Sequence, residues 1–230
     1  MKNYLLICLA LLAGSLLLAQ EHAAQFNAAD QSVSLLPTAH TMPRGTHAIT
    51  TMEFVLFQYS YAPTNRLHLS AMMMPLFILV DEEAFRTLTV GAKYRYLSKR
   101  EFDSAAWVSY SPVPKLLTVG NVMSMSLDKT SMHIVAGFTS RPTVGRGKPF
   151  VGLGGIAEIS HRLSLVGEVS IIPDGTVLYE EDNEDMEVYS SILILGLRLK
   201  GGMTCWDLGG VVSLEGKTSV APFIKATFCF

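Results

Sequence analysis

The sequence predicts an all-β protein, an antiparallel up-and-down transmembrane β-barrel of about twelve strands, with ten strands as the alternative. Apolar and polar residues alternate with a period of two along most of the chain, which is typical of strands with two unlike faces. The segments that alternate are close to the ~9–11 residues that a tilted strand needs to cross a bilayer. Short polar connections also alternate with longer ones rich in Pro and Gly, as in outer-membrane barrels.

The N-terminus predicts export. Residues 1–20, "MKNYLLICLALLAGSLLLAQ", place one Lys before a long apolar run that ends near small and polar residues. This pattern indicates a secretory signal peptide; an N-terminal membrane anchor is the alternative, because the run is nearly long enough to span a bilayer. We expect a short N-terminal segment at 21–30 and the barrel at 31–230.

Twelve candidate strands follow from the alternation. The first has the weakest pattern, but an even count with both chain ends on the periplasmic side requires it. The expected strands are 31–39, 47–59, 66–78, 86–97, 103–111, 116–126, 131–140, 149–159, 162–172, 188–199, 203–213 and 219–230.

The composition of the polar faces indicates which side of each strand points inward. They are rich in Gly, Ser and Thr with isolated charges, whereas a solvated face normally carries more Lys and Glu. A confined lumen with the apolar faces outward, toward lipid, suits this composition. A soluble barrel of lipocalin type would have the reverse arrangement.

Eight charged residues fall on the predicted lumen face by parity. They comprise four acids and four bases, and this balance predicts ion pairs that narrow the interior, whereas a selective pore more often shows one sign in excess. Glu158 and Glu168 lie on neighbouring strands, where they would repel unless a base reaches them or one takes up a proton. The predicted lumen charges are Glu53, Lys93, Arg95, Glu158, Glu168, Arg198, Asp207 and Lys225.

The last strand ends on an aromatic residue. In "SVAPFIKATFCF" the even-numbered positions from Val220 to Phe230 are all apolar. A terminal strand ending in Phe resembles the C-terminal signal of bacterial outer-membrane proteins, which the barrel assembly machinery reads. In a closed barrel this strand would pair with the first, so the terminus would be tied down.

The resemblance extends over most of residues 32–230. The segments "LLPTAHTMPRGTHAITTMEFVLFQYSYAPTNRLHLSA", "GFTSRPTVGRGKPFVGLGGIAEISHRLSLVGEVSIIP" and "GLRLKGGMTCWDLGGVV" are similar to a family of outer-membrane β-barrel proteins from Bacteroidota-type bacteria. Ala62 and Pro63 replace the Gly-Val pair of that family's first turn. The resemblance implies the barrel fold, a location in the bacterial outer membrane, and contact with its lipid and lipopolysaccharide. It supplies no catalytic residues.

Candidate chemical sites are weak. His68, His133, Ser70, Ser131 and Glu168 share the predicted lumen face, and a membrane hydrolase would need a Ser, a His and an acid side by side. No motif places them side by side, and lumen histidines with satisfied hydrogen bonds are the simpler interpretation.

Two other motifs carry no site. The acidic run "EEDNED" at 180–185 lacks the ligand spacing of a calcium loop. The run "GLGG" at 152–155 lies in mid-strand, where Gly marks a bend or a filled lumen.

The two cysteines after the signal peptide, Cys205 and Cys229, fall on the lumen face of adjacent strands. They would lie opposite each other, within reach of a disulfide, if the hairpin were centred near Lys217, and would be imperfect neighbours in another register. We therefore keep both a bridge and two thiols open.

The function predicted from the sequence is that of a structural or narrow-channel barrel, a monomer without catalytic activity. Net charge is −2, and no basic surface or motif points to nucleic acid. No cofactor or metal site is predicted. The alternatives are a membrane-embedded hydrolase of lipid or lipopolysaccharide and a periplasmic ligand-binding barrel.

Overall fold

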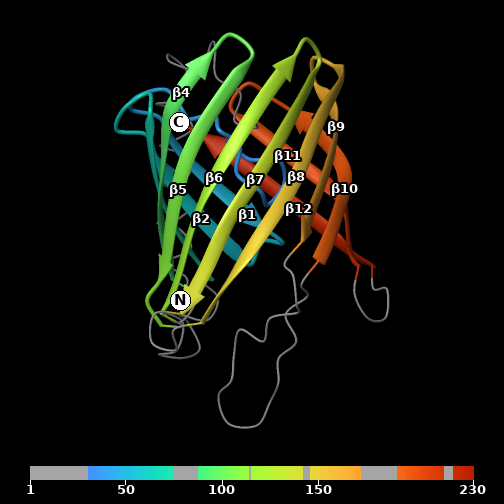
Figure 1. Ribbon diagram of the computed structural model, residues 1–230. Helices are drawn as coiled ribbons and strands as arrows, with labels where there is room; N and C mark the ends of the chain where they lie inside the picture. The colour runs from blue at the N-terminus through green and yellow to red at the C-terminus, as the bar shows by residue number, and fades with distance from the viewer. Residues whose placement is uncertain (1–30, 75–87, 114, 142–145, 172–190, 215–219) are drawn as a thin grey trace, which may run out of the picture.

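Twelve antiparallel strands form one closed barrel in the computed structural model (Figure 1), which describes residues 31–74, 88–113, 115–141, 146–171, 191–214 and 220–230. Each strand pairs with the next along the chain, and β1 pairs with β12 to close the ring. The predicted fold class is confirmed. The strands are β1 His47–Met52, β2 Leu56–Tyr61, β3 Leu67–Met73, β4 Thr89–Lys99, β5 Phe102–Ser111, β6 Leu116–Leu127, β7 Thr130–Arg141, β8 Arg146–Ser160, β9 Leu163–Ile171, β10 Ser191–Lys200, β11 Thr204–Ser213 and β12 Val220–Cys229.

The barrel has two ends that we name by what lies there. The terminal end holds the start of β1, the end of β12 and the tight turns such as β4–β5 and β6–β7, and it is uppermost in Figure 1. The loop end is the opposite one and holds the β1–β2 turn, the end of β9 and the start of β10. No helix in the described residues is long and apolar enough to cross a membrane.

The C-terminal residue is tied into the ladder. The His47 N–H donates to the Phe230 carbonyl at 2.8 Å, and the Phe230 N–H donates to the His47 carbonyl at 2.9 Å. The His47 and Phe230 rings also stack, with centroids 5.7 Å apart. The final strand therefore leaves no free edge, because its backbone groups pair with the first strand.

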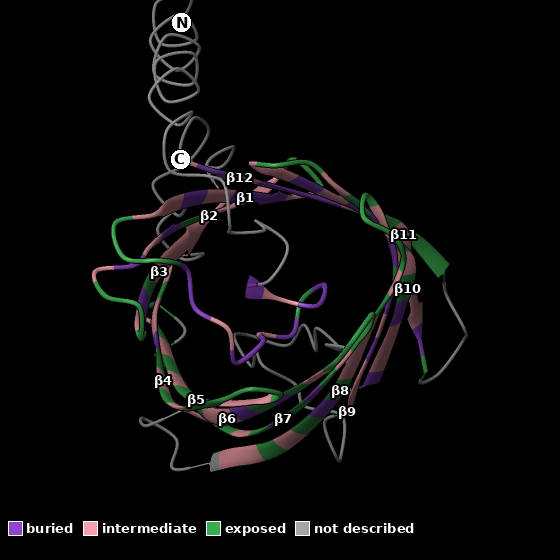
Figure 2. Cartoon of the chain, turned by 90° about the horizontal axis from the view of Figure 1, so that it is seen from above, coloured by how far each residue is buried: buried purple, intermediate pink, exposed green. Residues whose placement is uncertain are grey.

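Large apolar side chains point outward and small or polar ones inward. On β9 and β10, Leu165, Leu195 and Leu197 are exposed at 51%, 56% and 44%, whereas Glu168 and Arg198 are buried. The alternation of the sequence is thus the alternation of the barrel wall, with its apolar face on the outside. Figure 2, viewed along the barrel, shows additional described chain inside the ring of strands.

Two predicted strands are wrong, and their errors cancel in the count. Residues 31–39 form no barrel strand; apart from an isolated bridge between Ser32 and Pro37, they make no ladder. The predicted strand 47–59 is two strands, because Glu53 and Phe54 turn the chain with φ of 53° and 56°. Left-handed backbone is common in hairpin turns but is usually occupied by Gly, Asn or Asp, so the sequence carried no warning of this turn.

Candidate functional site

The lumen is occupied by the chain's own N-terminal part. Residues 31–42, which we call the lumen segment, precede β1 and contact the inner faces of strands around the ring. Their apolar side chains Val33, Leu36, Ala39 and Met42 are buried. A twelve-stranded barrel is wider than the ~8-stranded barrels whose interior side chains alone can fill, and the lumen segment supplies the additional filling.

The first part of the lumen segment is a small hairpin-like loop. The Thr38 N–H donates to the Gln31 carbonyl at 3.1 Å, and the Val33 N–H donates to the Leu36 carbonyl at 2.9 Å. Between these bonds the chain reverses at residues 33–36. The loop therefore presents several backbone N–H and C=O groups at its tip that need partners from the barrel wall.

Glu168 of β9 binds the N–H groups of this tip. Its side chain is 2% exposed, and one oxygen, Oε2, accepts three hydrogen bonds at 2.8, 2.9 and 3.0 Å, from the N–H groups of Ser34, Leu35 and Leu36. Successive N–H groups that converge in this way form an anion-binding nest. Hydrogen bonds to a charged acceptor are stronger than neutral ones, so this carboxylate is a principal anchor of the loop.

Basic residues bind the carbonyl groups of the same tip. Arg198 Nη2 donates to the Ser32 carbonyl at 3.0 Å and also to the Val33 carbonyl. Lys225 Nζ donates to the Ser34 carbonyl at 2.7 Å and to the Ser32 hydroxyl at 2.6 Å. The tip is thus held by an acid on its donor side and by two bases on its acceptor side.

Asp207 of β11 balances the two bases. It faces Arg198 and Lys225 directly across the β10–β11 and β11–β12 pairs. Arg198 binds it through two hydrogen bonds, of 2.6 and 2.7 Å, and Lys225 Nζ lies 3.5 Å from it. The three residues form a row of base, acid and base across neighbouring strands, in which each buried charge has a partner of opposite sign, as buried ion pairs require.

Lys93 of β4 holds the two ends of the loop from the other side of the barrel. Its Nζ donates to the Thr38 carbonyl at 3.0 Å and to the Gln31 carbonyl at 3.3 Å. The loop therefore spans the lumen from β4 to β9, β10 and β12. Its contacts come from residues far apart in the sequence.

The second part of the lumen segment leads back to the wall. The Ala39 N–H donates to Ser124 Oγ at 2.8 Å, and His40 Nδ1 lies 3.0 Å from Asp103. The Thr41 hydroxyl then donates to the Asn65 carbonyl at 2.6 Å. These contacts bring the chain out at the terminal end, where β1 begins.

Two glycines of β8 make room for the loop. A Cβ at Gly152 would lie 2.5 Å from Leu36 Cδ1, and a Cβ at Gly154 would lie 2.6 Å from Val33 Cγ2. Both distances are too short for a real side chain. The run "GLGG" is therefore the face against which the lumen segment packs.

The predicted lumen charges are not all in the lumen. The structure buries Lys93, Glu168, Arg198, Asp207 and Lys225. The prediction for Glu53 is wrong: it lies exposed in the β1–β2 turn, where its carboxylate accepts the Ile224 N–H at 2.7 Å.

Two further predicted charges lie toward the terminal end. Arg95 Nη2 donates to the Asn65 carbonyl at 2.9 Å. Glu158 is half-buried and pairs with Lys200 at 3.2 Å. Glu158 is opposite Ser164, four residues along β9 from Glu168, so the two acids do not meet.

Cys205 and Cys229 are buried and form no disulfide. Cys205 faces Thr227 across the β11–β12 pair, so the hairpin is centred on residue 216 and the two thiols are diagonal neighbours. The bridge considered from the sequence required a register centred one residue later.

The Ser–His–acid combination considered from the sequence is not assembled. His133 Nδ1 lies 2.8 Å from Ser124 Oγ and its Nε2 lies 3.0 Å from Ser131 Oγ. Both ring nitrogens therefore contact hydroxyls, and Glu168 is engaged by the lumen segment. Within the described residues no group of three His, Cys, Asp or Glu could hold a metal ion.

Two cavities lie beside the lumen segment among the described residues. One, of about 240 Å³, lies between the loop and strands β1 to β5, and includes His68 and Lys93 in its lining. The other, of about 250 Å³, lies on the side of His40, His133 and Lys200. Sequence reasoning missed the lumen segment and both cavities, because the contacts that create them join residues up to 198 positions apart.

Comparisons with known proteins find similar folds only. No family model matches the chain, and no curated protein matches it. Among solved structures, the NanC porin has a TM-score of 0.49 at 7% identity, covering 80% of this chain and 98% of that one. LpxR from Salmonella typhimurium has a TM-score of 0.46 at 9% identity, covering 81% and 99%. A triple mutant of the Rhodopseudomonas blastica porin has a TM-score of 0.39 at 13% identity, covering 76% and 55%.

Proposed function

We propose that this chain is a bacterial outer-membrane β-barrel whose lumen is closed by its own N-terminal segment, and that it acts as a structural or narrow-channel protein without catalytic activity. The observation that carries the proposal is the loop of residues 31–38, which crosses the interior and is bound on both sides by buried charges. A passage for ions would have to go around this loop or displace it.

The two faces of the wall support the membrane location. Large Leu, Ile, Val and Met side chains are exposed on the outside, as at Leu153, Leu195 and Met132. Water would disfavour so much exposed apolar area, since soluble proteins rarely show large apolar patches. A lipid bilayer favours an apolar outer surface. The same arrangement disfavours the periplasmic ligand-binding barrel, because the apolar face of such a barrel would point inward.

The contacts of the lumen histidine disfavour the hydrolase. A Ser–His nucleophile needs an acid on the second ring nitrogen to orient and stabilise the imidazolium. In this protein Ser131 occupies that position on His133, and Ser124 Oγ already accepts the Ala39 N–H. This arrangement anchors the lumen segment and offers no activated nucleophile.

Membrane lipid and lipopolysaccharide are the partners that the outer face would contact. The assembly machinery would read Phe230 before the barrel closes. After closure the ladder between His47 and Phe230 ties this residue down. We expect the folded protein to be a monomer, because a closed barrel has no free strand edge through which to associate.

The test is the conductance of the folded protein in planar lipid bilayers before and after removal of the loop tip. The Thr38 N–H to Gln31 carbonyl bond closes a turn-like junction, so residues 32–37 can be replaced by Gly-Gly with the ends still joined as in a four-residue turn. The four charges around the tip, two acids and two bases, remain balanced and become hydrated.

We expect low conductance from the unmodified protein and a large, steady conductance from the Gly-Gly variant. A large, steady conductance from the unmodified protein would mean that the lumen is open and that the proposal is wrong. Low conductance from a folded Gly-Gly variant, with folding checked by heat-dependent gel mobility, would mean that something other than the loop closes the barrel.

A further inference from the structure

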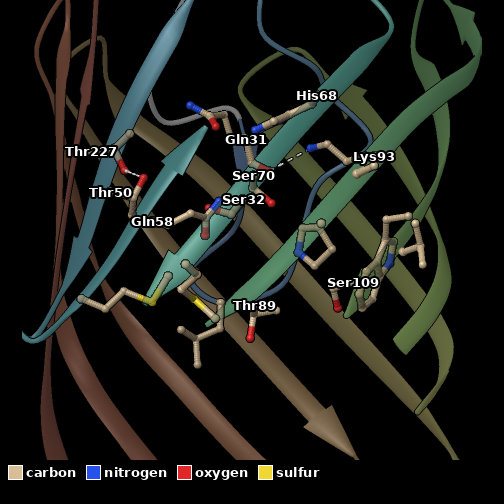
Figure 3. A pocket seen from close by; sticks show the side chains of 18 of the residues that line it. Gln31, Ser32, Thr50, Gln58, His68, Ser70, Thr89, Lys93, Ser109 and Thr227 are labelled. Carbon is tan, nitrogen blue, oxygen red and sulfur yellow. Dashed lines mark hydrogen bonds between the residues drawn. The ribbon is translucent and has the colours of Figure 1, made fainter. Parts of the chain in front are cut away.

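A row of nitrogen donors lines the cavity on the β1–β5 side. His68 of β3 faces Lys93 of β4, and Lys93 faces Trp107 of β5 in the strand register. All three residues line the same cavity, and Figure 3 shows the His68 and Lys93 side chains beside Gln31 of the lumen segment. Directly opposed residues on neighbouring strands have Cβ atoms about 4.5–5.5 Å apart, so one small ligand could contact His68 and Lys93 together. The indole Nε1 of Trp107 lies on the far side of β5, where a Cβ on Gly120 of β6 would come within 2.8 Å of it.

This row lacks the acid that its counterpart has. Across the barrel, Arg198 and Lys225 flank Asp207, and Asp207 together with the nearby Glu168 balances their two charges. In the described part of the chain no carboxylate pairs with Lys93, whose Nζ bonds only to two backbone carbonyls. The buried charges of the interior are therefore three bases against two acids, and Lys93 is the base in excess. Buried charges are normally paired.

Two further donors of the row have no partner among the described residues. Both ring nitrogens of His68 and Nε1 of Trp107 are buried without a hydrogen bond. His68 is only 6% exposed. Buried polar groups that stay unpartnered are rare in proteins and call for an explanation such as a bound ion or ligand.

The rest of the lining suits an oxygen-rich ligand. Among the described residues that line this cavity there is no Asp or Glu. Its other polar side chains are hydroxyls and one amide on the wall, which can donate to oxygen atoms of a ligand: Thr50, Gln58, Ser70, Thr89, Ser109 and Thr227.

We propose that this cavity is a binding site for a small oxyanion, a carboxylate or phosphate group, held by Lys93 and His68. The anion supplies the negative charge that the row lacks. A volume of about 240 Å³ leaves room for a small metabolite or an inorganic ion. The site requires only the folded barrel with its lumen segment, and it goes beyond the closure proposed above.

The test is isothermal titration of the full chain in detergent at constant ionic strength. Succinate and inorganic phosphate are the two probes, and chloride and glucose are the controls for a halide and for an uncharged polar solute. We expect one molecule of succinate or phosphate to bind per chain. Binding of succinate alone would assign a carboxylate ligand, and binding of phosphate alone a phosphate ligand.

Two variants remove different parts of the site. Lys93→Met keeps the aliphatic stem and removes the charge, and we expect a loss of affinity of about tenfold or more, the effect of one charge-assisted hydrogen bond. Because Lys93 also anchors the lumen segment, His68→Leu is the second variant; it removes a ring with no existing hydrogen bond, so the fold loses none. Lys200→Met, in the other cavity, is the matched control and should bind as the unmodified protein does.

Four results would overturn the proposal. They are the absence of binding by both oxyanions, unchanged affinity in the folded Lys93→Met and His68→Leu variants, equal binding of glucose, and equal binding of chloride, which would indicate an adventitious ion only. Conductance is not a readout of this test, so its failure is distinct from a failure of the closure proposal.

Discussion

Replacing the carboxylate of Glu168 by an amide tests whether charge holds the lumen segment in place. Glu168→Gln keeps the size and shape of the side chain and its carbonyl oxygen. The three N–H groups at the loop tip can still donate to that oxygen, but the acceptor is neutral. The variant therefore separates the charge of the nest from its geometry.

The magnitude follows from the three bonds of 2.8, 2.9 and 3.0 Å. A hydrogen bond to a charged group stabilises by about 1.5–3 kcal/mol and a neutral one by about 0.5–1.5 kcal/mol, so each bond loses roughly 1 kcal/mol. The total is about 3 kcal/mol in favour of release of the loop. At about 1.4 kcal/mol per factor of ten, the population with a displaced loop rises about a hundredfold.

The assay is the frequency of opening events of single barrels in planar bilayers, with the unfolding temperature measured in parallel. Glu158→Gln is the matched control, because Glu158 is a half-exposed acid whose pair with Lys200 is worth at most about 1 kcal/mol. We expect frequent openings and a lower unfolding temperature from Glu168→Gln only. Equal opening frequencies in the two variants would refute the reasoning, since the charge of Glu168 would then not hold the loop.

Three further predictions concern packing, the thiols and orientation. Gly154→Val places a side chain where the loop packs, and overpacking costs about 1–3 kcal/mol. We expect more opening events than from the control Gly155→Ala, whose Cβ would meet only an ordinary contact at 3.8 Å. Equal opening frequencies would show that the loop shifts to accommodate the side chain and stays in the lumen. Unfolded, non-reduced protein should react with two equivalents of a thiol reagent at Cys205 and Cys229, whereas folded protein should react slowly because both are buried; no reactive thiol after unfolding would mean a disulfide. An epitope inserted near Asp182, in a connection outside the described residues, should be detected on intact cells, and detection only after permeabilisation would reverse the expected orientation.

The faces of the wall could be predicted from the sequence because they depend on local chemistry. A strand whose polarity alternates with a period of two can place its polar residues on only one of two faces, the inner or the outer. Small polar residues fit the inner face of a narrow barrel. Parity therefore placed Lys93, Glu168, Arg198 and Asp207 on the inner face, where the structure buries them. The twelve-strand count also agrees, although the two errors at its N-terminal end compensate.

The lumen segment could not be predicted because its conformation depends on partners far along the chain. Residues 31–39 alternate as a strand does, and nothing local distinguishes a strand from a short loop that reverses at residues 33–36. The decisive partner, Glu168, is 134 positions from Ser34. The turn at Glu53 and Phe54 was missed for a different reason. Its conformation depends only on local backbone angles, but neither residue is typical of left-handed φ.

In the closure proposed above, the loop and the charges of the wall depend on each other, and this is how so short a segment would close so wide a barrel. The loop tip has three donors and three acceptors on the backbone with no partners of their own inside the loop, and it would not leave water without replacements. The wall has Glu168, Arg198 and Lys225, which would not remain dry without hydrogen bonds. Each set supplies partners to the other, although Glu168 Oε1 has none among the described residues, so the proposed closure requires no large hydrophobic plug. Because both sets can also be satisfied by water, we expect the closed and hydrated states to differ by less than the sum of these bonds. A change of a single charge, as in Glu168→Gln, should then shift the balance between them.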